Sequence, residues 1–134
     1  MRPTLISDPS QLNECREVFA EMSASWASVS AKSAPEVASR AEAQVFGQMV
    51  VALAEWLGPS SKNAQTGPLQ ELHLLAKGIS AHQGKLLADK SQLWWPEHSI
   101  TGVRHGERIV MTAQGFSKLC DACLNDVAHT SPRN

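Results

Sequence analysis

The chain has 134 residues, the length of one domain and enough to bury a core without disulfide or metal cross-links. Its apolar fraction of 43% and charged fraction of 19% exclude a predominantly disordered chain. A formal charge of −1 gives no overall indication of a nucleic acid, a membrane surface or an acidic substrate as partner. We therefore expect a single domain over 1–134, with flexible ends at 1–8 and 129–134.

The charge is unevenly distributed along the chain. Residues 1–72 contain five Lys/Arg against eight Asp/Glu, whereas residues 73–118 contain six against three. A basic second half joined to an acidic first half favours a domain that presents one face to an anion. Cations spread over such a length are also typical of an ordinary solvated surface.

The cysteine count and the hydropathy pattern bear on the compartment. Three cysteines are an odd number and cannot all enter a closed set of disulfides. No apolar run approaches the roughly 20 residues needed to span a bilayer, and the N-terminus has no long apolar segment. We expect a reduced, cytoplasmic protein with no membrane partner.

The first part of the chain predicts two helices. After a cap at Asp8 or Ser10, apolar residues recur at three- and four-residue spacings as far as about Ser28. A second helix is expected to begin near Pro35, because proline is favoured in the first turn of a helix. It is expected to end at Leu57, before a Gly-Pro pair.

The second half of this second helix, from Val45 to Leu57, is apolar around most of its circumference. Such a helix is typical of the centre of a core or of an oligomer interface. We expect it to anchor the core or to pair with its copy in a homodimer. The residues expected at that dimer interface are Phe46, Met49, Val50, Leu53 and Trp56.

The middle of the chain predicts two shorter helices, over residues 68–77 and 81–93. We interpret the intervening Gly78-Ile79-Ser80 as a helix C-cap, a buried apolar residue and the N-cap of the next helix. Trp94-Trp95-Pro96 is expected to end the second of these helices.

Two structural periods meet in residues 99–119. Apolar and polar residues alternate as far as Thr112, which predicts strands, and a glycine-containing turn at 104–107 divides them into a hairpin. After Gly115 the apolar spacing becomes helical, which predicts a last helix over 114–128.

This order of helices, tight turn, hairpin and closing helix resembles the winged helix-turn-helix domain over residues 68–128. The segment Met111–Gly115 is similar to the Leu-Thr-x-x-Gly step that closes the wing in bacterial one-domain regulators. The resemblance implies a transcriptional regulator with one helix in the major groove and the hairpin tip against phosphate or minor groove. The residues it implies for contact with double-stranded DNA are Ser80, His82, Gln83, Lys85, Lys90, Arg104, His105 and Arg108.

The expected fold is therefore mainly α, with about five helices and one C-terminal β-hairpin in a winged-helix-like arrangement. The alternative is that 68–93 is an ordinary helical hairpin and 99–112 an ordinary β-hairpin. Two departures from the helix-turn-helix pattern favour the alternative: Lys77 precedes Gly78 where a small or apolar residue is expected, and Gly84 stands where the second helix should place an apolar residue. Gly84 also weakens that helix by about 0.5–1 kcal/mol relative to alanine.

Cys120 and Cys123 form a C-x-x-C pair on one helical face. A zinc site needs about two further ligands, and no second C-x-x-C or H-x-x-x-H accompanies the pair. Both thiols also continue the apolar phase set by Phe116, Leu119 and Leu124, which favours core packing over metal binding. We expect no metal and no cofactor.

Two classes of function stay open, and neither is enzymatic, because no G-x-S-x-G, Walker A or G-x-G-x-x-G motif is present. The first is the DNA-binding regulator. The second is a protein-binding inhibitor or adaptor, such as an antiactivator or a phage- or plasmid-encoded antagonist of a host protein. Adjacent Trp94 and Trp95 favour the second class, because neighbouring helix residues point about 100° apart and one tryptophan is expected to anchor a partner.

Overall fold

The computed structural model describes residues 9–58, 67–87 and 99–130. Within these ranges the only named secondary-structure elements are helices. In chain order they are α1 (Pro9–Ser30), α2 (Pro35–Leu57), α4 (Gly67–Ala81) and α5 (Ala113–Thr130). Of the ends expected to be flexible, 1–8 and 131–134 lie outside the described residues.

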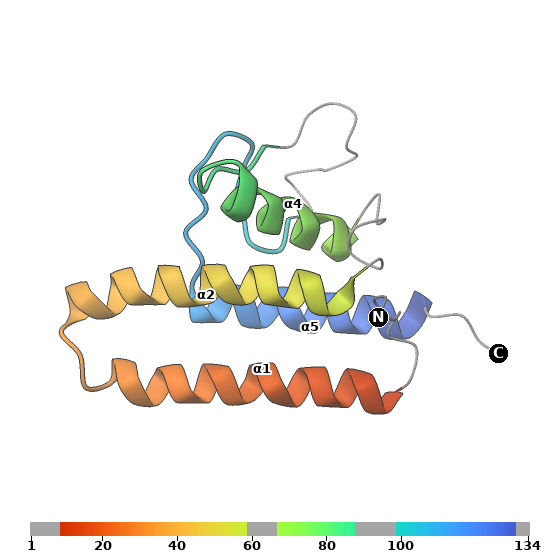
Figure 1. The fold of residues 1–134 in the computed structure, drawn as a ribbon, viewed down its shortest axis with the longest axis horizontal. Coiled ribbons are helices and arrows are strands. Elements are labelled where there is room, and N and C mark those ends of the chain that lie inside the picture. Colours follow the sequence, from red (N-terminus) through yellow and green to blue (C-terminus); the bar gives the residue numbers. More distant parts are fainter. Residues whose placement is uncertain (1–8, 59–66, 88–98, 131–134) are drawn as a thin grey trace.

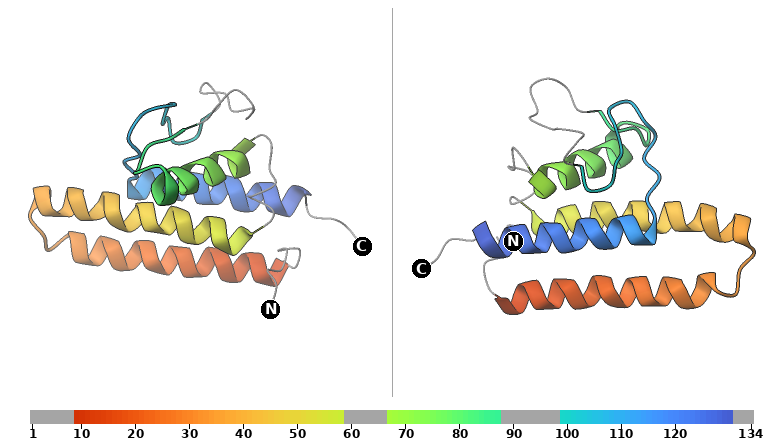
Figure 2. Two further views of the ribbon diagram at one scale, coloured as in Figure 1. Left: turned by 45° about the horizontal axis from the view of Figure 1, so that its top comes forward. Right: turned by 180° about the vertical axis from the view of Figure 1, so that it is seen from behind.

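The helices stack in three layers (Figures 1 and 2). α2 and α5 lie side by side in the middle layer, α1 covers one side of them, and α4 covers the other. α1 and α2 are antiparallel neighbours joined by the short connection at 31–34. Three of the predicted helices are confirmed, and their bounds differ from the expected ones by only a few residues.

A chain of aromatic rings connects α1, α2 and α5. Phe116 of α5 lies between Phe19 and Phe46, with ring centroids 5.6 and 5.8 Å away. Trp56 meets Phe19 edge-on at 5.8 Å, and Trp26 meets Phe46 edge-on at 6.0 Å. The edge-on arrangement is favoured by the quadrupole of the rings. These ring contacts therefore hold α1 against the middle layer.

The position of α2 explains its apolar circumference. Its N-terminus has Pro35 in the first turn, and at its C-terminus the Gly58 amide donates to the Ala54 carbonyl at 3.0 Å with φ of 55°. Between these ends α2 contacts all three other helices, so its side chains are buried on several sides. The apolar run therefore reflects a central helix of one chain.

α4 differs from the two helices predicted for this region. It runs without interruption through Gly78-Ile79-Ser80, and the Ser80 hydroxyl donates to the Ala76 carbonyl at 2.8 Å instead of capping a new helix. The chain turns only afterwards, where Gln83 and Gly84 adopt φ of 59° and 83°. The prediction of a helix over 81–93 is wrong for residues 82–87, which are not helical. Residues 88–93 lie outside the described residues.

Glycine is required at position 78 because the backbone of Lys85 passes close to it, and not because a helix ends there. A Cβ atom there would overlap the Lys85 carbonyl oxygen and come within 2.7 Å of Ile109 Cδ1. The chain after α4 folds back across this glycine, so the residue that resembles a C-cap in the sequence is a contact point in the middle of a helix.

The predicted C-terminal β-hairpin is also wrong, and with it the winged-helix-like arrangement. Residues 106–109 pair with 84–86, not with 99–103: Leu86 N donates to Glu107 O at 2.9 Å and Ile109 N to Gly84 O at 2.7 Å. The pairing amounts to one isolated antiparallel bridge between Lys85 and Arg108, and no strand forms in the described ranges. The alternation over 99–112 arises from a loop that buries Val103 and Met111.

Replacing Gly78 by alanine tests this close approach. We expect Gly78→Ala to lower the free energy of unfolding by about 1–3 kcal/mol, because the clash involves backbone that cannot move aside cheaply. Chemical denaturation followed by circular dichroism measures the change.

Gly47 is the matched control, because it is also a buried helical glycine. Its added Cβ would meet only Ile79 Cδ1 at 3.8 Å, an ordinary contact. Gly47→Ala should be neutral or stabilise by about 0.5–1 kcal/mol through helix propensity. Equal effects at both positions would contradict the close approach of Lys85 and Ile109 to Gly78.

Candidate functional site

An open apolar hollow lies between α1 and α2. It has a volume of about 530 Å³ and is lined by Met22, Gln44, Val45, Gln48, Met49 and Ala52. Met22 and Val45 are large apolar residues that expose 40% and 38% of their surface, whereas Met49 forms a buried floor. We call this hollow the α1–α2 groove.

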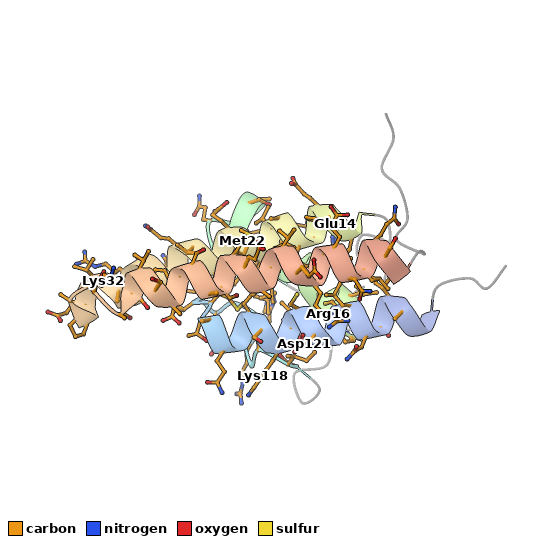
Figure 3. The ribbon with its side chains drawn as sticks, turned by 90° about the horizontal axis from the view of Figure 1, so that it is seen from below. Glu14, Arg16, Met22, Lys32, Lys118 and Asp121 are labelled. Atoms are coloured by element: carbon orange, nitrogen blue, oxygen red, sulfur yellow. The ribbon has the colours of Figure 1, made fainter. Side chains whose placement is uncertain are left out.

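Helical spacing explains which residues lie along the two walls of the groove. On α1, Glu14, Val18 and Met22 follow one another at four-residue intervals and so form one row. Figure 3 shows Glu14 and Met22 on the edge of α1 that faces α2. On α2, Val45, Met49 and Ala52 are similarly spaced and meet that row from the other side.

The opposite edge of α1 faces α5 and is different in character. There Arg16 Nη1 lies 3.6 Å from Asp121 Oδ1, and Figure 3 shows the two residues together. A smaller hollow of about 280 Å³ lies beside this ion pair, over Phe19, Phe116 and Cys120. The only cation of α1 is thus directed away from the groove.

The three cysteines are core residues. Cys15, Cys120 and Cys123 are free thiols with 0–5% exposure, and the Cys123 thiol donates to the Pro68 carbonyl at 3.4 Å. Burial raises the pKa of Cys15 to about 11 and that of Cys120 to about 12, and it also raises the pKa of Cys123. Because the thiolate is the nucleophilic form, burial lowers the reactivity of these thiols. No group of three metal-binding side chains occurs among the described residues.

Glu71 is a buried carboxylate on α4, with 3% exposure. Its Oε2 accepts from the Ser99 hydroxyl at 2.7 Å, the Thr101 amide at 3.0 Å and the Thr101 hydroxyl at 2.6 Å. Its Oε1 accepts from the Ile100 amide at 2.9 Å. A buried carboxylate is tolerated when its oxygens accept hydrogen bonds in this way, so Glu71 fixes the loop at 99–101.

The N-terminus of α5 is held by a second carboxylate. Glu42 of α2 accepts from the Ala113 amide at 2.8 Å, and the Thr112 hydroxyl accepts from the Gly115 amide at 3.0 Å. Together they satisfy two of the first amides of the helix, and the Glu42 charge also complements the helix dipole. Thr112 is thus a helix cap and not the closing step of a wing.

The residues predicted to contact DNA fall into two groups in the structure. Lys85 and Arg108 are brought opposite each other, with Arg104 in the adjoining turn, and all three are exposed. His105 is exposed in the same turn, and Ser80, His82 and Gln83 lie at the end of α4. Lys90 lies outside the described residues, as do Trp94 and Trp95 of the predicted partner site.

The residues predicted for a dimer interface lie mostly inside one chain. Phe46, Met49, Val50 and Leu53 are at most 2% exposed, and Trp56 is half-buried against Phe19. Most of their apolar surface is thus covered within one chain, and a homodimer through these residues stays a prediction.

Sequence reasoning did not identify Glu71, Glu42 or the groove that Met22 and Val45 line. A signal for Glu71 is present, because it stands among the four leucines of 69–75 in a helix that is apolar on more than one face. A carboxylate in such a helix is expected to be buried and therefore to have dedicated donors.

Comparison with protein-family models, curated proteins and solved structures found no match to this chain. Among the residues described, no helix combines the length and the apolarity that crossing a bilayer demands.

Removing the charge of Glu71 tests its role as the anchor of the loop. We expect Glu71→Gln to lower the free energy of unfolding by about 1–3 kcal/mol, because the amide nitrogen would face donors that now lose their acceptor. Urea denaturation measures the change. Glu107→Gln is the control, because that carboxylate is exposed and accepts the Arg104 amide within its own turn. A Glu71 effect no larger than that of Glu107 would contradict the buried anchor.

Proposed function

We propose that this protein is a non-enzymatic helical domain that binds another protein, as an inhibitor or adaptor, and that the α1–α2 groove is its docking surface. The observation that carries the proposal is the location of its exposed apolar residues. Of the six large exposed hydrophobic residues in the described structure, four are on α1 and α2, and two of these, Met22 and Val45, line the groove.

Burying these apolar side chains against a partner would lower the free energy of the complex, because within this chain they are exposed to water. Large apolar side chains that gather around a groove mark surfaces for protein contact more often than isolated exposed ones do. The groove is also formed by two helices held by the aromatic rings beneath it, so it exists before a partner arrives. A preformed site of this kind avoids part of the ordering cost of association.

A photo-crosslinking amino acid at position 45 tests this proposal in extract of the organism that encodes the protein. We expect position 45 to give a discrete crosslinked protein, and Met22→Lys in the same chain to remove it. Position 110 is the matched control, because Val110 is an exposed valine, 59% accessible, outside the groove. The same products at both positions, or none at 45, would overturn the assignment of the groove.

A second candidate function is binding of double-stranded DNA through the basic corner, which we define as Lys85, Arg104 and Arg108. The observation that favours it is that cations from two separate segments come together, with the Arg108 guanidinium 3.6 Å from where a Gly84 Cβ would stand. Contacts from such turns would reach phosphates, which position a protein without reading sequence.

Electrophoretic shifts with a random duplex at low and high salt test this second candidate. We expect binding to fall with salt, and Arg104→Ala/Arg108→Ala to reduce the slope of log affinity against log salt by about 2. Lys118→Ala on α5 is the control cation and should leave the slope less changed. Absence of a shift even at low salt would refute DNA binding by this corner.

A further inference from the structure

We propose that the partner of the α1–α2 groove is an amphipathic helix whose apolar face is bordered by Lys and Arg. This inference rests on the proposed function and specifies the chemistry of the partner. It follows from the shape of the groove and from the charges of its two walls.

The shape favours a helix as the occupant. The walls are two antiparallel helices; α2 supplies Val45, Met49 and Ala52 to the apolar lining, and α1 supplies Met22. A groove of this type accepts the apolar side chains that an amphipathic helix presents at three- and four-residue intervals. The rim residues Gln44 and Gln48 are exposed and polar, so the apolar contact is confined to the floor and to Met22 and Val45.

The α1 wall is acidic. Glu14 is in the row that leads to Met22, on the edge of α1 that faces α2 (Figure 3). Glu17 and Glu21 form the neighbouring row, further towards the solvent face of α1, and all three carboxylates are exposed. The single cation of α1, Arg16, is engaged with Asp121 on the edge that faces α5. No cation of α1 therefore offsets Glu14 on the edge of α1 that faces α2.

The α2 wall adds no compensating charge near the groove. Glu55 is exposed one turn beyond Ala52, and the only cation of the helix is Arg40, more than one turn before Val45. Glu42 binds the Ala113 amide at the N-terminus of α5, and the other charges of the two helices are two cations against five carboxylates: Arg16 and Arg40 against Glu14, Glu17, Glu21, Glu36 and Glu55.

This charge selects between possible occupants. Lys and Arg beside the apolar face of a partner would be attracted to the walls, whereas Asp or Glu would be repelled. A second copy of this chain docked through the same groove would bring two acidic α1 helices together, which disfavours it. The complementary partner is a basic amphipathic helix.

Two synthetic peptides provide the direct test. One is an 18-residue helix with a leucine face bordered by lysines, and the other has glutamate in place of every lysine. Binding is followed by NMR of methionine methyl groups, because Met22 and Met49 line the groove and Met111, 2% exposed elsewhere in the core, is an internal control. We expect the lysine peptide to shift the Met22 and Met49 signals but not that of Met111, and the glutamate peptide to shift none.

Variants separate attraction by the walls from general stickiness of the peptide. Glu14→Gln/Glu21→Gln should weaken binding of the lysine peptide about threefold or more, whereas Glu36→Gln, at the far end of α2, should change it less. Val45→Lys should abolish binding, and Val110→Lys should not.

The outcomes distinguish this inference from the proposal on which it rests. Equal binding of both peptides, with Val45→Lys still effective, would overturn the basic partner and leave the groove as a docking surface. Shifts of all three methionines, or none, with the lysine peptide would overturn the inference, while crosslinking from position 45 would still decide the proposed function.

Discussion

The buried carboxylate of Glu71 is the constraint on which the second half of the structure depends. A charge removed from water must be surrounded by donors, and here the donors come from three consecutive residues, 99–101. Their arrival at α4 directs the chain so that Val103 is buried and the turn at 104–107 returns towards the end of the same helix. There Gly78 leaves room for the backbone at Lys85.

These contacts make the two outer layers unequal. α4 is covered on its outer side by the loop that Glu71 anchors and by the pairing of 84–86 with 106–109. α1 has no comparable cover in the described part of the chain, and it rests on the middle layer through Leu12, Cys15, Phe19 and Trp26. The apolar groove is on this less covered side, so the asymmetry of the layers and the candidate docking surface have one origin.

Local signals predicted the long helices well. Pro35 and Gly58 bound α2 because their backbone preferences act within one turn, and the periodic apolar residues of α1 and α5 report burial directly. The prediction failed where a local signal had a distant cause. Gly78 resembles a helix end in the sequence, yet a glycine is needed there because Lys85 and Ile109 pack against it. The alternation after Ser99 resembles a hairpin, although the hydrogen-bond donors of Ser99, Ile100 and Thr101 bind Glu71.

The candidate site was the least predictable part for the same reason. The sequence shows that Met22 and Val45 are apolar and at helical spacing, which is equally consistent with burial. Only the separation of α1 from α2 decides that these two side chains stay exposed while Met49 does not. That separation depends on aromatic residues far along the chain, such as Phe116.

The bond between Glu42 and the Ala113 amide joins residues 71 positions apart, and this has a consequence for the order of folding. Closing a loop of that length costs chain entropy before any contact compensates for it, whereas α1 and α2 meet across a connection of only a few residues. The first turn of α5 lacks this acceptor until α2 is in place. The α1–α2 pair is therefore expected to form early and to act as the template on which α5 is completed.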